Sequence, residues 1–480
     1  METVNTGTCD LAVVGGGFTG ASLALHLARE KADLSIAFFE PRGRLGYGLA
    51  YDTADPLHRI NVPAEKMTVV GDAPDDFLQW CLHEAGVDEF DPDARGADGH
   101  LYPARGDFGR YVEERLAAHP LPVETVPSAA RVVERISGGF RVEAANGQSL
   151  TARRLVLCNS HGSPQFPWAT DNDVVGHPRR LDDPWKPEAL GRIGTRDEVL
   201  IFGTGLTMAD TVVGLLDRGH VGPIRAVSRR GLLPRPHGCS YEPVPVDPCP
   251  GGETPGPAKF LRIIRSMLRD AESRGMEWQP VIEGVRAALP TIWPQWSMRE
   301  RRSVLRHLRP YWDTHRYRLS PQVLQVLADA RSSGQLTVTA GSIVGVRLDA
   351  SEDRFRVGVR PRGSEEARTV SADSLVNCIG PVSDIRRSRD PLFSGLLQKG
   401  MIAADSLGLG VQVDQQCRVL DSDHEVVPGL YAAGPLTRSV FGEVMGVPEI
   451  AAQTAALSRV IKRDPLPEAQ TSPDEERAML

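Results

Sequence analysis

Three glycines near the N-terminus have the spacing that binds phosphate groups. Gly15, Gly17 and Gly20 follow an apolar run in G-x-G-x-x-G register, and Ala and Leu at helical spacing come directly after them. In this pattern the first glycine permits a tight turn, the second lets the backbone approach a pyrophosphate, and the third lets the helix pack close to the strand. The free N–H groups at the N-terminus of the helix then point at the phosphates.

A carboxylate ends the next apolar segment. Residues 34–39 read as a strand that ends in Glu40, about 20 residues after the last glycine, where an acid holds a ribose hydroxyl. A lone glycine motif is not specific, and its alternative interpretation is an ordinary turn between a strand and a helix. The strand before it, the helix after it and the acid together favour a dinucleotide site.

A second glycine turn lies in the middle of the chain. Gly203 and Gly205 follow the apolar run 198–202 and precede a helical pattern that extends to residue 217. Met208 stands where the third Gly or Ala of the pattern belongs. The chain therefore contains two candidate dinucleotide sites.

The strand after the second turn ends in arginines. Residues 224–227 are followed by Ser228, Arg229 and Arg230, with no acid at this point. An acid would repel a 2′-phosphate, whereas guanidinium groups form bidentate, charge-assisted bonds with it. The second site therefore suits NADPH better than NADH. The alternative is that both arginines are solvated surface charge.

Other reaction chemistries lack the residues that they need. The seven cysteines are scattered, with no C-x-x-C pair, which indicates a reducing cytosol and neither a disulfide framework nor a zinc site. Nucleophilic triads and metal clusters are not apparent. A net charge of -7 argues against broad nucleic-acid binding, and no apolar run approaches membrane-spanning length. We expect a cytoplasmic protein with neither nucleic-acid nor membrane partners.

The two glycine turns begin two similar series of elements. Each continues with a helix, a strand, a three-stranded meander and an apolar return strand, at 154–158 in the first half and 375–380 in the second. This repeat predicts an α/β fold with two Rossmann-like dinucleotide-binding domains. Helical patterns rich in Trp and Tyr at about 257–330 predict an insertion. It would be a lid over a site or a small subdomain with its own core, and its aromatic content favours the core.

These patterns also suggest domain boundaries. We expect a discontinuous first domain at 1–190 and 335–462, and a second at 195–334 that includes the insertion. The polar, proline-containing residues 463–480 read as a flexible tail.

The order of the motifs resembles that of two-dinucleotide-binding flavoproteins. G-x-G-x-x-G, G-x-G-x-x-M, N-C-I-G and G-L-Y-A-A-G occur in this order over nearly the whole chain. The segments HRINVPAEKM, WDTHRYRLSP and GLYAAGPLTRSVFGE are similar to bacterial FAD/NAD(P)-binding proteins, which largely lack an assigned reaction. Their wider relatives are class B flavin monooxygenases and pyridine-nucleotide reductases. The resemblance implies FAD in the first site and NADPH in the second.

The resemblance also implies roles for particular residues. Asn61, Val62 and Met67 would lie beside the isoalloxazine ring, and Gly434 would lie near the ribityl chain and pyrophosphate. Pro435 stands where most reductases have an acid that holds a ribityl hydroxyl. The expected cofactor contacts are Gly15, Gly17, Phe18, Thr19, Gly20, Glu40, Pro41, Arg42, Tyr47, Asn61, Val62, Met67, Gly203, Gly205, Leu206, Thr207, Arg229, Arg230, Gly380, Gly434, Pro435 and Pro448.

No catalytic side chain is defined by a motif. The segment VVGHPRRLDDPW contains Gly176, His177 and Trp185, but not at the spacing of the Baeyer–Villiger pattern F-x-G-x-x-x-H-x-x-x-W. Asn61 and His177 are the candidates, and for His177 the alternative is a structural histidine between the domains.

The expected function follows from two facing cofactors. NADPH would reduce FAD by hydride transfer, and reduced FAD with O2 would oxygenate a small-molecule substrate that enters between the loop 47–67 and the helical insertion. The alternatives are an NADPH:acceptor oxidoreductase without oxygen insertion and a non-catalytic flavin-binding or sensor protein.

Overall fold

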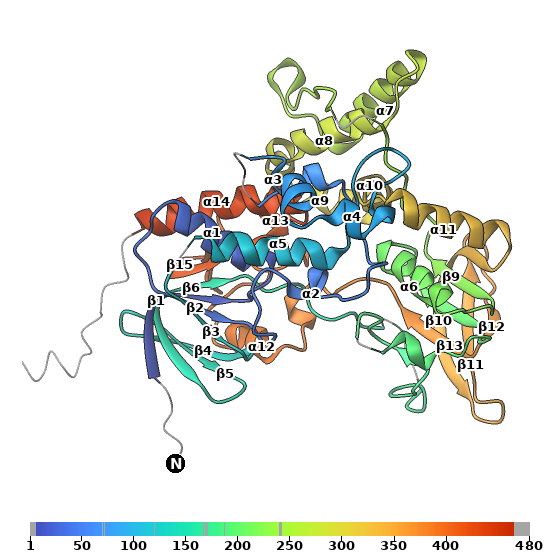
Figure 1. Ribbon diagram of the computed structural model, residues 1–480, viewed down its shortest axis with the longest axis horizontal. Helices are drawn as coiled ribbons and strands as arrows, with labels where there is room; N and C mark the ends of the chain where they lie inside the picture. The colour runs from blue at the N-terminus through green and yellow to red at the C-terminus, as the bar shows by residue number, and fades with distance from the viewer. Residues whose placement is uncertain are drawn as a thin grey trace, which may run out of the picture.

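The computed structural model describes residues 6–464, apart from residues 70, 72, 120, 167, 169, 170, 187, 240 and 241. Of the expected tail, residues 465–480 lie outside the described residues. Two α/β units lie side by side, and a layer of helices stands above them (Figure 1). No helix in the described part of the chain is long and apolar enough to cross a membrane.

The first sheet is built on a parallel core. Its strand order is β14-β15-β6-β1-β2-β3, and β4 and β5 extend it beside β6. The strands are β1 (Thr6–Val14), β2 (Ile36–Phe39), β3 (Val123–Val126), β4 (Ala130–Ile136), β5 (Gly139–Ala144), β6 (Ser149–Leu157), β14 (Arg418–Leu420) and β15 (Val426–Ala432). The last meander strand and the return strand of this half are one continuous strand, β6, which pairs with β5 and β1.

Helices cover both faces of this sheet. On one face α1 (Phe18–Arg29) packs between α5 (Arg105–Ala117) and α14 (Val447–Arg463), where their apolar side chains meet those of β1 and β2. On the other face α12 (Pro391–Gln398), which no sequence pattern indicated, packs against β4. A short helix, α3 (Asp76–Gln79), continues as a π-helical turn (Trp80–Glu84).

The second sheet has the order β12-β11-β10-β9-β8-β13-β7. The strands are β7 (Arg180–Leu181), β8 (Val199–Phe202), β9 (Ile224–Ser228), β10 (Leu336–Asp349), β11 (Arg354–Pro361), β12 (Arg368–Ala372) and β13 (Ser374–Asn377). β13, β8, β9 and the first part of β10 are parallel, and α6 (Leu206–Asp217) and α11 (Pro321–Ser332) pack together on them. The chain thus contains the two expected Rossmann-like units.

The domain boundary expected at residue 335 is wrong. Residues 336–377 form β10 to β13, which pair with β9 and β8 of the second sheet. β7 also belongs to this sheet, although it precedes residue 190. The chain returns to the first sheet only after β13. The meander therefore belongs to the same unit as the glycine turn that precedes it, as in the first half.

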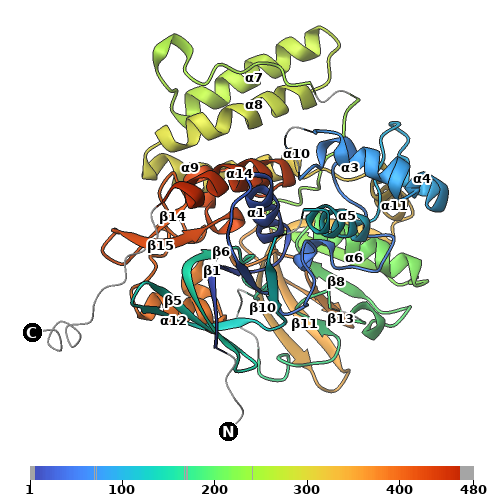
Figure 2. The ribbon, with the colours of Figure 1, turned by 60° about the vertical axis from the view of Figure 1, so that its left-hand side comes forward.

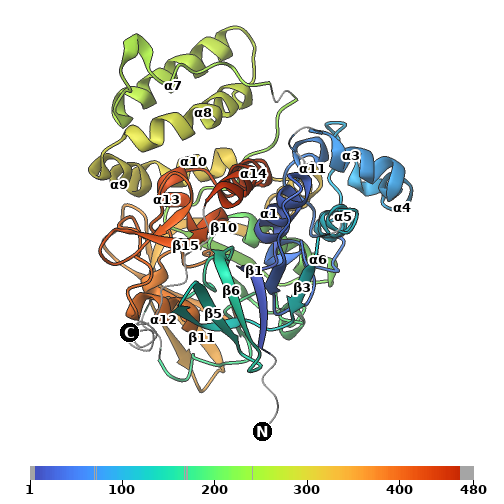
Figure 3. The ribbon, with the colours of Figure 1, turned by 90° about the vertical axis from the view of Figure 1, so that its left-hand side faces the viewer.

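The helical insertion comprises four helices. They are α7 (Pro257–Ser273), α8 (Gln279–Ile292), α9 (Met298–His307) and α10 (Arg309–Arg316). Figures 2 and 3 show α7 and α8 above α9 and α10, which in turn lie over the short α13 (Arg438–Phe441) and α14. Pro310 lies in the first turn of α10, where a proline loses no hydrogen bond.

Candidate cofactor and substrate site

The first glycine turn has a conformation that only glycine tolerates. Gly15 has φ +103°, and a Cβ there would lie 2.8 Å from the carbonyl oxygen of Cys158 at the end of β6. At Gly20 a Cβ would lie 2.2 Å from the carbonyl oxygen of Gly15, so the helix sits directly on the turn. α1 begins after Gly17 with no side-chain cap among the described residues and no acid in its first turn. Its free N–H groups therefore fit a pyrophosphate.

Glu40 lies beside this turn. Its carboxylate is buried and accepts hydrogen bonds from the backbone N–H groups of Gly16 at 2.9 Å and Arg42 at 3.0 Å. The Arg42 guanidinium also pairs with Asp52 at 2.9 Å, and Pro41 is exposed between them. These contacts hold the carboxylate at the end of β2, where the sequence places a ribose-binding acid.

The C-terminal part of the chain completes the first site. Gly434 follows β15 with φ +72°, and a Cβ there would lie 2.5 Å from the Thr19 hydroxyl in the first turn of α1. Its N–H donates a hydrogen bond of 2.7 Å to the Gln453 side chain of α14. Pro435 and Pro448 lie in the first turns of the next helices, a 3₁₀ turn and α14. The structure therefore brings residues 19 and 434 together.

The second glycine turn repeats the first. Gly203 has φ +103°, as Gly15 does, and a Cβ would lie 2.2 Å from the carbonyl oxygen of Cys378 after β13. Gly205 precedes α6, whose first turn begins with Leu206 and Thr207 and has no side-chain cap among the described residues. A Cβ on Gly205 would have nothing within 4 Å, so the space over this turn is open. The third-glycine position, Met208, is fully buried, and Gly380 follows β13 with φ +88°.

Four arginines converge near the end of β9. Arg229 and Arg230 line a pocket of about 230 Å³ together with Arg306 of α9, Pro310 and Arg362, and no carboxylate lines it among the described residues. Arg230 also donates a hydrogen bond of 3.0 Å to the Tyr311 hydroxyl and lies 4.9 Å from the ring centre. Converging guanidinium groups of this kind fit a phosphate better than isolated solvated charges do.

The sequence pattern identified only half of this arginine pocket. Arg229 and Arg230 end the strand next to a glycine turn, which is a recognisable position. Arg306 and Arg362 come from α9 and from the turn after β11, far along the chain. No local spacing signals that these elements meet.

The loop 47–67 is held by packing and by hydrogen bonds. Tyr47 is buried against Gly109, where a Cβ would lie 2.3 Å from the ring, and its hydroxyl donates to Glu113 at 3.0 Å. Met67 is buried in an apolar core with Phe108 and Tyr111 of α5, and Val62 is half-buried against this core. The carbonyl oxygen of Asn61 faces His237 Nε2 at 3.0 Å. The backbone of Asn61 therefore has a structural contact with the second unit.

His237 is a site residue that the sequence analysis missed. It is half-buried, and the removal of its ring from solvent, together with the nearby Arg318 guanidinium, lowers its pKa to about 4. Arg235 and Gly238 lie close to it in the sequence, but they form no binding motif that would have singled out residue 237. Neutral at physiological pH, it links the second unit to the loop 47–67.

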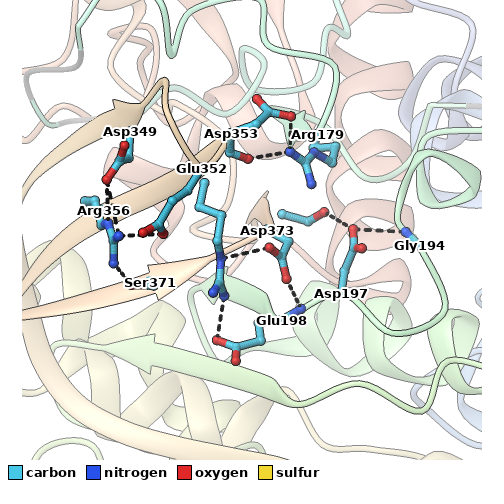
Figure 4. A network of polar contacts seen from close by, with 12 residues as sticks. Arg179, Gly194, Asp197, Glu198, Asp349, Glu352, Asp353, Arg356, Ser371 and Asp373 are labelled. Carbon is cyan, nitrogen blue, oxygen red and sulfur yellow. Dashed lines mark hydrogen bonds and ion pairs between the residues drawn. The ribbon is translucent and has the colours of Figure 1, made fainter.

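The structure does not support a catalytic role for His177. Its Nε2 lies 3.2 Å from Asp353, which also binds Arg179. Figure 4 shows Asp353 paired with Arg179, and Arg354, the next residue, pairs with Glu198, which immediately precedes β8. The cluster therefore lies at the amino ends of the strands. The glycine turn 203–205 follows the carboxyl end of β8. His177 is therefore a structural residue on the wrong edge of the sheet.

A buried ion pair joins the two units beside their glycine turns. Arg105 of α5 binds both carboxylate oxygens of Asp210 of α6, at 3.0 and 3.1 Å. Its guanidinium also lies 5.1 Å from the Trp185 ring centre. Burial raises the pKa of Asp210, while Arg105 opposes that shift. The pair fixes how the second glycine turn sits relative to the first unit.

Two glycine-turn α/β units that are joined in this way define a protein with two dinucleotide sites. Residues 12–162 match the family model described as FAD-NAD(P)-binding, and residues 400–445 match that of an FAD binding domain. FAD and a nicotinamide dinucleotide are therefore its cofactors. A comparison with curated proteins found no match to this chain.

Solved structures share the fold over nearly the whole chain. L-lysine 6-monooxygenase from Pseudomonas syringae is 18% identical, with a TM-score of 0.65, and the alignment covers 95% of this chain and 99% of that one. The ornithine N-hydroxylase of Kutzneria sp. 744 is 20% identical, with a TM-score of 0.62 and the same coverage. Ornithine hydroxylase from Pseudomonas aeruginosa is 16% identical, with a TM-score of 0.64 and again the same coverage. At these identities the likeness shows the fold.

Proposed function

We propose that the chain is an FAD- and NADPH-dependent monooxygenase that acts on a small molecule. The observation that carries this proposal is the pair of glycine turns, at Gly15 and Gly203, which the Arg105–Asp210 ion pair holds together. A dinucleotide on each turn would bring a flavin and a nicotinamide to the same side of the molecule. Fold-mates named as N-hydroxylases and as a lysine monooxygenase support oxygenation as the outcome.

The residues present fit these two cofactors. In the first unit the N-terminus of α1 would bind the pyrophosphate of FAD, and Glu40 would bind its ribose. Gly434, which lies against Thr19 of α1, would let the backbone after β15 approach the cofactor closely. In the second unit the N-terminus of α6 binds the pyrophosphate of NADPH, and the four-arginine pocket binds the 2′-phosphate. Bound FAD would supply hydride acceptance and O2 activation.

The N-terminus of α14 would face the flavin. It has no side-chain cap among the described residues, but Glu449 lies in its first turn and would weaken its positive end. Arg286 and Arg316 both pair with the Glu449 carboxylate, the second at 3.4 Å. These guanidinium groups neutralise the acid, so the end of the helix keeps the positive potential that favours an anionic reduced flavin.

The holoprotein in an oxygen electrode tests this proposal. A monooxygenase consumes NADPH and O2 in equal amounts and transfers one ¹⁸O atom from ¹⁸O2 to a substrate, which mass spectrometry detects. Rapid anaerobic reduction of a quinone or dye with no ¹⁸O incorporation would indicate the plain oxidoreductase instead. Bound FAD that NADPH does not reduce within minutes would indicate the binding or sensor protein.

A further inference from the structure

The helical insertion lines a partly open cavity of about 390 Å³. Its walls come mostly from α7, α8, α9 and α10 and from residues 438–443, and most of them are aliphatic or aromatic side chains, among them Ile264, Val285, Trp293 and Trp312. Protein interiors contain few voids larger than a water molecule, whereas ligand pockets measure about 300–1,000 Å³. The insertion has the apolar core that its aromatic content indicated, around Ile292, Trp293 and Trp296, and beside this core lies a space of the size that a ligand fills.

One wall of the cavity carries a buried cation. Arg438 is only 5% exposed. Its Nε donates a hydrogen bond to the Gly442 carbonyl at 3.3 Å, while its two terminal nitrogens donate none within the described part of the chain. A buried charge is costly unless it is paired and hydrogen-bonded. Arg438 thus has donors left for a partner that the cavity would hold.

The nearest carboxylate is already engaged. Glu443, the one acid among the described residues that line the cavity, lies 3.9 Å from the Arg438 guanidinium, too far for a hydrogen bond. It accepts a hydrogen bond of 2.7 Å from the Trp312 indole, and its other oxygen lies 3.6 Å from Arg316 Nε. Glu443 therefore balances Arg316 more closely than it balances Arg438.

His161 lies in the positive electrostatic potential of the arginines at this wall of the cavity. It follows β6 at the carboxyl edge of the first sheet, is 8% exposed, and has no hydrogen-bond partner for either ring nitrogen among the described residues. Burial, together with the charges of Arg438 and Arg309, lowers its pKa to about 4. The positive end of the cavity thus lies toward the sheet edge that carries the first glycine turn.

We propose that this cavity is the substrate site of the monooxygenase, and that it takes an apolar carboxylic acid whose carboxylate binds Arg438. Arg309, which also lines the cavity, already pairs with Asp313 at 3.4 Å. The aliphatic and aromatic walls would receive a phenyl or branched aliphatic body. A cationic side chain such as that of ornithine would instead meet the Arg438 guanidinium, because the nearby acids Glu443 and Asp313 lie beside Arg316 and Arg309, which offset their charge. This inference rests on the proposed function, since it assigns the substrate class of that enzyme.

Calorimetric titration of the oxidised holoprotein, without NADPH, tests the substrate class. The probes are 4-phenylbutyrate, 4-phenylbutyramide and ornithine. We expect the acid to bind about tenfold or more tightly than the amide, because one hydrogen bond to a charged group changes an equilibrium by about this factor. Equal binding of acid and amide, or tighter binding of ornithine, would overturn the proposal.

Variants locate the binding site. Arg438→Gln should remove the preference for the acid over the amide, whereas Arg299→Gln, an exposed arginine of α9, should leave it unchanged. Val285→Phe and Leu289→Trp fill the cavity from α8 and should each abolish binding of both probes. Unaltered binding in both filled variants, with FAD absorbance and melting temperature retained, contradicts the proposal. NADPH reduction of FAD, recorded in the same samples, tests the proposed function separately.

Discussion

The four-arginine pocket makes a quantitative prediction about cofactor choice. A hydrogen bond to a charged group contributes about 1.5–3 kcal/mol. Arg229 is exposed, so Arg229→Ala should lower kcat/KM for NADPH by about 1.5 kcal/mol, or roughly tenfold. Arg230 is half-buried and held by the Tyr311 hydroxyl, so Arg230→Ala should cost about 2–3 kcal/mol, or roughly 30- to 150-fold.

The comparison with NADH isolates the 2′-phosphate. NADH lacks this group, so kcat/KM for NADH should change less than about twofold in both variants, and the NADPH/NADH ratio should fall by the factors above. Steady-state rates at fixed ionic strength, with Arg299→Ala as an exposed control on α9, provide the measurement. Equal losses for both nucleotides, or an unchanged ratio, would refute the assignment of this pocket to the 2′-phosphate.

Three further predictions concern the ion pair, the first glycine site and a buried histidine. Arg105→Leu leaves Asp210 buried and unpaired, so urea unfolding at pH 8 should show a loss of about 3–5 kcal/mol in the free energy of unfolding. The loss should be smaller at pH 5, because a carboxyl group with a raised pKa then binds a proton. The double variant Arg105→Leu with Asp210→Asn should recover part of the lost stability, and no recovery would contradict the pairing. Gly434→Ala places a Cβ at a positive φ and against the Thr19 hydroxyl, so absorbance at 450 nm should show a loss of bound FAD. Adding Thr19→Ala should restore part of the bound FAD. Full FAD retention in the single variant would contradict a tight contact between residues 434 and 19. The pKa of His161 is about 4 in the folded protein and about 6.5 in the unfolded one, so the unfolded state binds the proton first as the pH falls. The free energy of unfolding should therefore decrease by about 3 kcal/mol between pH 7 and pH 4. In urea titrations His161→Gln should reduce this pH dependence, and an unchanged pH dependence would contradict a buried neutral ring.

Local patterns predicted the phosphate-binding parts of the fold. Gly15 and Gly203 share φ +103° and the same contact with the end of a neighbouring strand, so a short G-x-G pattern determines the geometry. Residues 336–377 were assigned to the wrong domain because their meander reads alike in either sheet, and only pairing with β8 and β9 decides between them.

Residues brought together from distant elements could not be predicted. Arg306 joins Arg229 only because α9 folds over the end of β9, and Arg438 faces a cavity that no spacing in its own segment indicates. His177 was a candidate because it lies between the domains in sequence, yet the fold places it at the amino edge of the second sheet. In each case the decisive information is long-range packing.

Tyr311 is a wall shared by two compartments. Its hydroxyl accepts a hydrogen bond from Arg230 in the arginine pocket, and its ring lines the apolar cavity. A molecule that shifts this ring from one side would change the free energy of binding on the other, and thermodynamic reciprocity would make the two effects equal. The total free energy of binding would then not depend on whether the nucleotide or the organic acid binds first, although each of them would change the affinity for the other.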